Sequence, residues 1–310
     1  MPLKEPKDMY QAAIKGNYAL GAFNIYSIES LQAVLDAAEI QNAPVIIQVS
    51  MGTRKYVKDF SLFIKVIKIY AENYHSHIFI QHDHCKSIQA CKEAIDAGVQ
   101  AVMFDGSDLP WEENITKTKE MVSYAKSRNI WVEAELGKIP GFEDCIFTEN
   151  VEYTAPEKAH EFIERSGCNA LAISVGTSHG GVLGRNDYLP FHTELMRRIA
   201  FLTPDYPFVL HGGASLPPEL IDECNRVGGK IPYWRNCKED DIAKAIELGI
   251  RKVNMDVDNF LVTTTAIRKF LQENPHIYDP RKYLSLARDA FQKEVEHKFL
   301  HVLHSAGRCI

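Results

Sequence analysis

The stretch LGAFNIYS, residues 20–27, decides between the two folds that best explain this 310-residue sequence. It begins with a short apolar run, Leu20–Ile25, that predicts a β-strand. An open, doubly wound sheet usually carries a glycine-rich phosphate-binding turn after its first strand. Residues 22–27 contain no such turn, which favours a closed barrel and leaves the open sheet as the alternative.

Eight short apolar runs of this kind recur along the chain, and stretches with helical periodicity separate them. Near-continuous apolar strands that alternate with amphipathic helices are typical of parallel strands buried on both faces. The pattern predicts an α/β fold, a single (β/α)8 TIM barrel domain over residues 1–310. The predicted strands are Leu20–Ile25, Pro44–Ser50, Ile78–Asp83, Ala101–Asp105, Ile130–Leu136, Ala170–Val175, Pro207–His211 and Lys252–Asp256. The clearest helices are Ile28–Gln41, Ser87–Ala97, Glu157–Ser166 and Asp240–Leu248.

The chain continues for about fifty residues beyond the last predicted strand, more than a minimal barrel needs. Thr263–Gln272 and Tyr283–Leu303 have amphipathic patterns, so residues 257–310 are predicted to form a C-terminal helical extension. This extension could pack on the barrel or on a second subunit.

Composition excludes several classes of protein. The 35 basic and 41 acidic residues give a net charge of −6, and the pI is near 6.1, which argues against general nucleic-acid binding. The apolar runs are too short to span a membrane, and residues 1–8 do not resemble a secretory signal. Seven cysteines without a C-x-x-C motif indicate free thiols in a reducing, cytoplasmic location rather than disulfides or a cysteine-based zinc site.

Polar side chains are predicted at the carboxyl end of nearly every strand, where barrel enzymes carry their active sites. Three of them are the histidines His84, His179 and His211, on three different strands. Catalytic zinc sites commonly use three protein ligands, and neutral imidazole suits zinc better than magnesium. We therefore predict a zinc site, the alternative being that each histidine is an ordinary buried or surface residue. His82 is excluded, because its side chain should point away from Asp83 and His84 if the strand pleat continues.

Two glycine-flanked segments follow the second and third of these histidines: HGG at 179–181 and HGGAS at 211–215. Glycines let backbone N–H groups approach and bind an anion, as phosphate sites on barrel loops do. A tight turn without a ligand is the alternative interpretation of each segment.

Seven motifs, taken in order, carry a specific resemblance that extends from near residue 1 to near residue 310. They are GAFN (21–24), QHDH (81–84), VEAELG (132–137), GTSHG (176–180), LHGG (210–213), KVNMD (252–256) and SAG (305–307). With them the chain resembles the class II, metal-dependent fructose-bisphosphate aldolase family, which includes tagatose-bisphosphate aldolases.

The resemblance implies a lyase that cleaves a ketose (bis)phosphate reversibly into a dihydroxyacetone phosphate-type ketone and an aldehyde. His84, His179 and His211 would bind Zn2+, with Asp105 and Glu135 as outer or alternate contacts. A monovalent cation is a further candidate cofactor. The implied substrate-binding residues are Asn24, Ser50, Gly180, Gly212, Gly213, Ser215, Asn254, Asp256 and Val257. We expect a homodimer or higher homo-oligomer that acts on a small sugar phosphate in carbohydrate metabolism, such as glycolysis.

The chemistry of aldol cleavage gives an independent reason for such a set. Breaking the C3–C4 bond leaves an enediolate, whose charge a zinc ion can stabilise as a Lewis acid. The C4 hydroxyl must lose a proton and the enediolate carbon must gain one, so two carboxyl groups are needed. The resemblance assigns these roles to Asp83 and to Glu143 in a mobile loop.

Several positions depart from the family pattern and bear on the substrate. Leu183 stands where a lysine is expected, and Ala214 and Val257 stand where hydroxyl residues are expected, although Ser215 follows Ala214. Phe260 stands where relatives have an arginine that binds a second phosphate. Each lost hydrogen bond to an anion typically costs about 1.5–3 kcal/mol.

These departures predict a preference for a ketose monophosphate or another ketose that is not a bisphosphate. The alternative is an ordinary glycolytic aldolase in which Arg54, Arg185 or another base replaces the missing contacts. Alternatives from other classes are a zinc hydrolase or isomerase, which would not need the Asp83 and Glu143 pair, and a non-catalytic relative.

Overall fold

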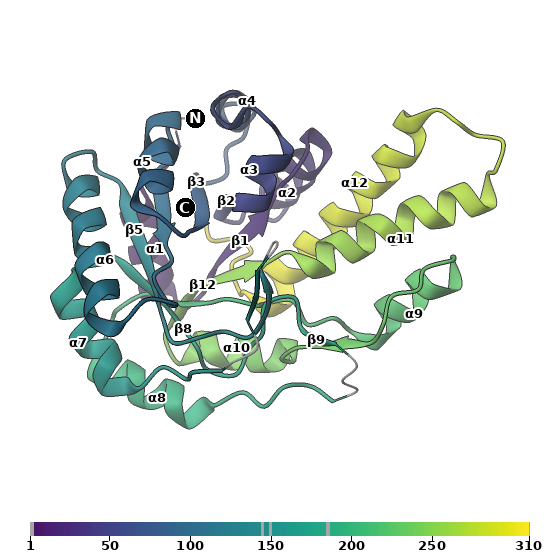
Figure 1. Cartoon of the computed structure of the whole chain (residues 1–310). Helices are drawn as coiled ribbons and strands as arrows, with labels where there is room; N and C mark the ends of the chain where they lie inside the picture. The colour runs from purple at the N-terminus through teal and green to yellow at the C-terminus, as the bar shows by residue number, and fades with distance from the viewer. Residues whose placement is uncertain (1–2, 144–145, 149–150, 184–186, 310) are drawn as a thin grey trace.

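Eight parallel strands close into a barrel in the computed structural model of the chain, as predicted (Figure 1). Around the barrel the order is β1-β2-β3-β4-β5-β8-β10-β12, and β12 pairs with β1 to close it. The open-sheet alternative is therefore excluded. The strands are β1 (Leu20–Asn24), β2 (Val45–Val49), β3 (Ile78–Cys85), β4 (Ala101–Phe104), β5 (Trp131–Leu136), β8 (Ala170–Ile173), β10 (Phe208–Leu210) and β12 (Ile250–Met255).

The structure describes residues 3–143, 146–148, 151–183 and 187–309, without the side chains of residues 142, 143, 146–148, 183 and 235. Two short antiparallel pairs lie outside the barrel: β6 (Gly141–Glu143) with β7 (Ile146–Thr148), and β9 (Val182–Leu183) with β11 (Trp234–Arg235). None of the helices in these ranges has both the length and the hydropathy to cross a membrane.

The helices are α1 (Pro6–Gly16), α2 (Ile28–Ile40), α3 (Met51–Tyr56), α4 (Phe60–Ala71), α5 (Ile88–Ala97), α6 (Trp111–Lys126), α7 (Pro156–Ser166), α8 (Thr193–Leu202), α9 (Pro218–Arg226), α10 (Glu239–Glu247), α11 (Val257–Glu273), α12 (Pro280–His297) and the π-helix η1 (Lys298–Val302).

The barrel interior changes from apolar to polar along its axis. Alternate strand residues point inward and outward, so Ala22 joins the inner apolar cluster while Phe23 packs against the helices. Tyr10 of α1 closes the N-terminal end, where its ring stacks on Trp131 at 4.7 Å. Buried polar side chains fill the opposite, C-terminal half, and this is where the candidate site lies. They include Gln48, Gln81, Asp83, Glu133, Glu135, His211, Lys252 and Asn254.

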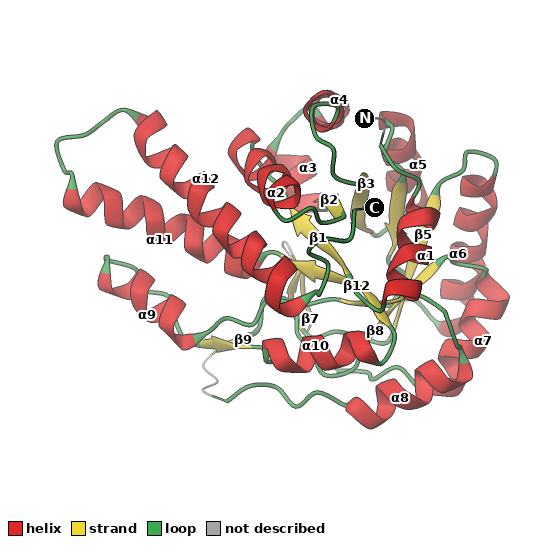
Figure 2. Ribbon diagram, turned by 180° about the vertical axis from the view of Figure 1, so that it is seen from behind, coloured by secondary structure: helices red, strands yellow, loops and turns green. Residues whose placement is uncertain are grey.

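The C-terminal extension consists mainly of two long helices, α11 and α12, which pack side by side and project beyond the barrel (Figure 2). Helix α12 also packs against α2, where Gln41 Nε2 donates to Glu296 Oε2 at 3.0 Å. The prediction that the first helix begins at Thr263 is wrong. It begins at Val257, because the Asp256 carboxylate accepts the Val257 N–H at 2.7 Å and caps the helix directly after β12.

A buried lysine joins this extension to the barrel. Lys298 is 1% exposed, and its Nζ lies 2.9 Å from Asp258 Oδ2 and 3.0 Å from Glu294 Oε1, with Glu239 as a third partner. Burial lowers the pKa of Lys298, but the carboxylates outweigh this effect and raise the pKa above its ordinary value. Asp258 in turn accepts the backbone N–H groups of Ser215–Leu216, each at 2.9 Å. The network thereby fixes the loop that follows His211.

We expect Lys298→Met to lower the free energy of unfolding by about 3–5 kcal/mol, because it leaves buried carboxylates without their counter-charge. Lys269→Met, on the exposed face of α11, is the matched control and should change stability by less than about 0.5 kcal/mol. Urea denaturation with unchanged m-values measures both effects. An equal, small change in the two variants would contradict the role given to Lys298.

Candidate metal centre and active site

The direction of His84 depends on a break in the pleat of β3. A continuous pleat would send Asp83 and His84 to opposite faces, so the assumption that the pleat alone separates His82 from both residues is wrong. His84 instead has a left-handed φ of 45°, and the pairing of β3 with β4 shifts register between His82 and Cys85. Histidine is one of the few non-glycine residues enriched in this conformation. The break brings Asp83 and His84 to the same end of the barrel interior.

His82 lies on the outer side of β3, as predicted, and takes no part in the site. Its Nδ1 is 3.1 Å from Cys85 Sγ, and its ring packs edge-on against Phe60 at 5.0 Å. Burial lowers the pKa of His82 to about 4. It is a neutral histidine of the layer between strands and helices.

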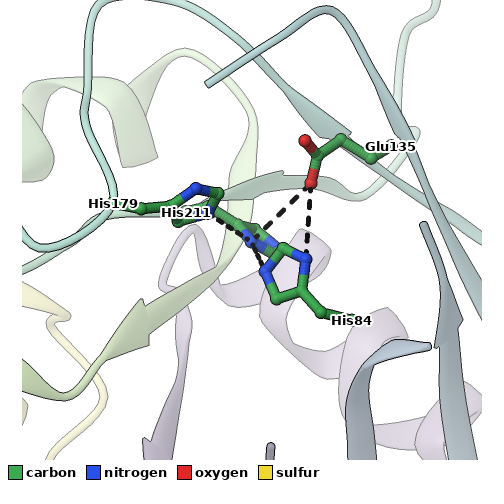
Figure 3. Close-up of side chains that lie close together, drawn as sticks. All are labelled: His84, Glu135, His179 and His211. Carbon is green, nitrogen blue, oxygen red and sulfur yellow. Dashed lines mark hydrogen bonds and ion pairs between the residues drawn. The ribbon is translucent and has the colours of Figure 1, made fainter. Parts of the chain in front are cut away.

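His84, His179 and His211 come together at the C-terminal end of the barrel (Figure 3). His84 Nε2 lies 2.8 Å from His211 Nδ1, and His179 Nε2 lies 3.4 Å from the same atom. All three side chains are buried. Glu135 points at this cluster, with Oε2 3.9 Å from His84 Nδ1 and 4.0 Å from His211 Nδ1.

Carboxylates bind the outer nitrogens of two of these histidines. Asp105 Oδ2 lies 2.9 Å from His84 Nδ1, and Glu133 Oε1 lies 3.0 Å from His211 Nε2. An outer N–H donated to a carboxylate fixes the tautomer in which the inner nitrogen presents a lone pair. The cluster of His84, His179, His211 and Glu135 could therefore hold a metal ion, and its nitrogen-rich donor set fits zinc.

Electrostatic interactions keep Asp105 and Glu133 ionised, and burial disfavours the charged forms of His179 and His211. Burial alone would raise the pKa values of Asp105 and Glu133, but hydrogen bonds and nearby positive charges outweigh it. His84 and Lys86 hold the pKa of Asp105 well below its usual range, and Lys252 and His211 lower the pKa of Glu133 to about 2. Burial lowers the pKa of His211 and of His179. Neutral imidazole is the form that binds a metal.

Asp83 lies beside the histidines but, unlike Asp105 and Glu133, does not bind an outer histidine nitrogen. Its Oδ2 accepts hydrogen bonds from Gln48 Nε2 at 2.9 Å and Asn254 Nδ2 at 3.0 Å, and lies 3.6 Å from His84 Nε2. Its Oδ1 accepts no hydrogen bond from the described residues but lies 3.9 Å from Lys252 Nζ, with which it forms an ion pair. Two amide donors thus fix the carboxylate and leave one oxygen able to take a proton.

Sequence reasoning gave no role to several buried polar residues below the cluster. Glu133 Oε2 accepts from Lys252 Nζ at 2.7 Å and from Gln81 Nε2 at 3.0 Å, while Glu133 Oε1 faces His211. The sequence did contain an indication that Glu133 faces the site. Glu133 and Glu135 are two residues apart on β5, so strand alternation places them on the same face. Lys252 likewise precedes Asn254 by two residues on β12.

We expect Asp105→Asn to weaken zinc binding by about 10–100-fold, because it removes the carboxylate that orients His84. The matched control is Asp108→Asn, since Asp108 binds the same Lys86 at 3.1 Å but is an exposed side chain. Competition with a fluorescent chelator measures both affinities. Equal affinities in the two variants would refute this role of Asp105.

Two adjoining pockets form a cleft beside Asp83 and His179. Its inner part is lined by Asn24, Asp83, His179, Gly180, Gly212, Asn254 and Asp256. The outer part, of about 470 Å³, shares Asn24, Gly180 and Asp256 and adds Ser50, Thr53, Leu216, Ile221, Ile231, Pro232, Trp234, Val257, Phe260, Leu261 and Thr264.

Two of the predicted substrate-binding residues, Gly213 and Ser215, do not line either part of the cleft. The N–H of Gly213 donates to Asn254 O at 2.9 Å, and that of Ser215 donates to Asp258. A Cβ at Gly213 would lie 2.4 Å from Val253 Cγ1, so close packing on β12 accounts for this glycine.

The positions that depart from the family pattern face apolar surroundings where the structure describes them. Ala214 is buried in a small cluster with Leu216 and Leu261, against which Val257 packs. Phe260 is 40% exposed and meets Tyr26 edge-on at 5.4 Å. The side chains of residues 183 and 185 lie outside the described part of the chain.

Glu143 is placed only by its backbone, at the end of β6, because its side chain lies outside the described part of the chain. Gly141 of the same strand forms a bridge with His179, and the His179 N–H donates to Pro140 O at 2.7 Å. The segment that carries Glu143 is therefore joined to the segment that carries one of the three histidines.

The comparisons with known proteins extend over nearly the whole chain. The family model of class-II fructose-bisphosphate aldolase matches residues 4–308. The fructose-bisphosphate aldolase of Treponema pallidum (strain Nichols) is 36% identical over 324 residues, covering 99% of this chain and 97% of that protein. The fructose-bisphosphate aldolase of Staphylococcus aureus (strain Mu50) is 37% identical over 300 residues, 96% of each. The solved structure of the YdjI aldolase from Escherichia coli K12 aligns with a TM-score of 0.78 at 27% identity, covering 100% of both chains.

Proposed function

This chain belongs to the class-II fructose-bisphosphate aldolase family, and on that basis we propose that it is a zinc-dependent aldolase acting on a ketose phosphate. In the cleavage direction the C3–C4 bond breaks, which yields a ketone and an aldehyde. His84, His179 and His211 would bind the zinc.

The observation that carries this proposal is the orientation of two imidazole rings. His84 and His211 direct their outer nitrogens to carboxylates, so their inner nitrogens, 2.8 Å apart, both present lone pairs. Two lone pairs at this distance repel each other, and a cation bound to both nitrogens would remove the repulsion. A bound zinc ion would supply Lewis-acid stabilisation of the negative charge that develops on the ketone fragment.

Asp83 takes the proton of the C4 hydroxyl in this proposal. Its carboxylate is held by Gln48 and Asn254, and it borders the inner part of the cleft together with His179. A carboxylate fixed in this way can accept the proton as the C3–C4 bond breaks and return it in the reverse direction. Glu143 would add a proton to C3 of the enediolate, which the backbone link between its strand and His179 supports.

The surroundings of the cleft support a substrate with fewer phosphates than a bisphosphate. The backbone N–H groups of Gly180, Gly212, Gly213 and Val257 are the candidates for binding one phosphate. That of Gly213 donates to Asn254 O, and that of Val257 donates to Asp256 Oδ1. Phe260 offers no charge for a second phosphate. We therefore propose a ketose 1-phosphate, or a ketose without phosphate, as the preferred substrate.

We expect kcat/KM for fructose 1-phosphate to be at least as high as for fructose 1,6-bisphosphate and tagatose 1,6-bisphosphate. The physical reason is that a second phosphate would lose solvation without gaining a cationic partner. Triose formation coupled to NADH oxidation measures all three rates. A bisphosphate value more than about tenfold above the monophosphate value would contradict this preference.

The names of the relatives favour one second candidate, a glycolytic fructose-bisphosphate aldolase in which other residues replace the missing contacts. Arg54 was one such candidate. Its guanidinium pairs with Glu93 and lies over the ring of Phe60, 5.0 Å from the centroid. Arg54 would have to leave both partners to reach a phosphate, and the same rate comparison decides between the two candidates.

A further inference from the structure

We propose that the outer part of the cleft binds an apolar substituent, an alkyl chain or an aromatic ring, on the aldehyde side of the substrate. The inference rests on the proposed aldolase function and adds the class of aldehyde. The substrate would then be a ketose phosphate whose far end, beyond C4, is apolar and uncharged.

The outer cleft adjoins the proposed catalytic centre. Both parts share Asn24, Gly180 and Asp256 as lining residues, and the inner part also borders Asp83 and His179. A substrate with its C3–C4 bond beside Asp83 can extend one end into the outer part, and the proposal assigns that end to the aldehyde side. This adjacency makes the substrate the occupant that fits the cleft.

The walls of the outer cleft are apolar and preformed. Leu216, Ile221 and Leu261 are buried, and they belong to one cluster that packs behind the cleft surface. Trp234, which lies on β11, packs against this cluster. Phe260, which lies on α11, meets the ring of Tyr26 edge-on. Helices α9 and α11 pack against each other, so the two sides of the cleft are held by regular structure.

The charge of the outer cleft disfavours an anionic aldehyde. Among its described lining residues no Lys, Arg or His occurs, and Asp256 is the only ionisable group. The Asp256 carboxylate accepts the Val257 N–H at 2.7 Å, which favours its charged form. A phosphate in this space would be repelled by the like charge of Asp256 and would lose solvation against apolar walls. An uncharged apolar group would have neither cost.

The reaction balances for such a substrate. The C4 hydroxyl gives its proton to Asp83, the C3–C4 electron pair stays on C3, and C4 leaves as an aldehyde R–CHO. C3 then gains one proton from Glu143, so no oxidant or further reactant is needed. The group R stays in the outer cleft throughout and takes no part in the bond changes.

The first test uses the synthesis direction, with dihydroxyacetone phosphate as donor and the zinc-loaded protein. We expect kcat/KM for phenylacetaldehyde to exceed that for glyceraldehyde 3-phosphate by about ten- to a hundredfold, the gain from burying a group of that size. Trp234→Ala should remove most of this preference, and Phe260→Arg should reverse it. Tyr278→Ala, an aromatic residue 93% exposed outside the cleft, should leave it unchanged.

The second test measures binding without metal or turnover. Titration of the metal-free protein with 2-phenylethanol should change tryptophan fluorescence, and Trp234→Phe should abolish that change, since Trp111 and Trp131 do not line the cleft. Phe260→Arg should weaken the binding about tenfold or more. No binding by the wild-type protein, or equal binding by all variants, would overturn the proposal.

Proton exchange separates failure of this inference from failure of the proposed function. Zinc-loaded protein that exchanges no C–H proton of dihydroxyacetone phosphate or dihydroxyacetone with D2O would refute the proposed function itself. Normal exchange combined with a preference for glyceraldehyde 3-phosphate would refute the apolar aldehyde alone. If Trp234→Ala changed the oligomeric state in sedimentation and not the aldehyde preference, the cleft would be an interface between copies of the chain, and the proposal would be wrong.

Discussion

Replacing His211 with alanine is expected to abolish zinc binding and to lower turnover by about 10³-fold or more. Its Nδ1 lies 2.8 Å from His84 Nε2 and 3.4 Å from His179 Nε2, so it is the common neighbour of the other two proposed ligands. Loss of one of three ligands removes the ion, and with it several kcal/mol of charge stabilisation. Metal analysis after gel filtration gives the zinc content, and steady-state assays give turnover.

His82→Gln is the matched control for this experiment. His82 is a buried histidine on β3 like His84, but it packs against Phe60 outside the barrel lumen. We expect this variant to retain one zinc per chain and most of its activity. A His211→Ala protein with full zinc and near-normal turnover would show that the metal, if needed, is bound elsewhere.

Replacing Asp83 with alanine is expected to lower kcat by about 10²–10⁴-fold while zinc stays bound. The contacts of Asp83 explain why kcat should fall while zinc stays bound. Amides of Gln48 and Asn254 hold it, whereas Asp105 and Glu133 orient the proposed ligands. Zinc content and kcat measured on one preparation test both parts.

Two further measurements keep the Asp83 experiment interpretable. Asp83→Ala leaves two buried amide donors without an acceptor, which should cost about 1–3 kcal/mol of stability, so thermal unfolding must be recorded beside activity. Asp83→Asn keeps the shape of the side chain and should be comparably inactive. Near-normal kcat in either variant would show that another group moves the proton.

The regular part of the fold could be predicted because its signal is local. The run 20–25 and its seven counterparts predicted all eight barrel strands, with ends that differ from the structure by at most two residues. Helix ends were predicted less well where a cap decides them. Residues 257–262 have no strong helical periodicity, and only the side chain of Asp256 shows that the helix begins there.

The residues of the candidate site could be predicted from their places at the strand ends. The directions and contacts of their side chains could be predicted less well. His84 lies beside Asp83 only because one residue adopts a left-handed backbone conformation, which residue type and spacing do not specify. The partners of Glu133 come from β3, from the residue that follows β10 and from β12, so their contacts depend on how the barrel closes. The apolar cleft combines residues from α9, β11 and α11, which are distant in sequence and meet only in the folded chain.

The central claim is that the three histidines hold a zinc ion that, with the neighbouring carboxylates, enables the ketone fragment to lose and regain a proton. Solvent exchange tests it most directly, by NMR of dihydroxyacetone phosphate in D2O with zinc-loaded and chelator-treated protein. The account predicts exchange of one of the two C–H protons on the hydroxymethyl carbon by the zinc-loaded protein, its loss after chelation and its return with added zinc. Exchange that is absent from the zinc-loaded protein, or equally fast after chelation, would contradict the account.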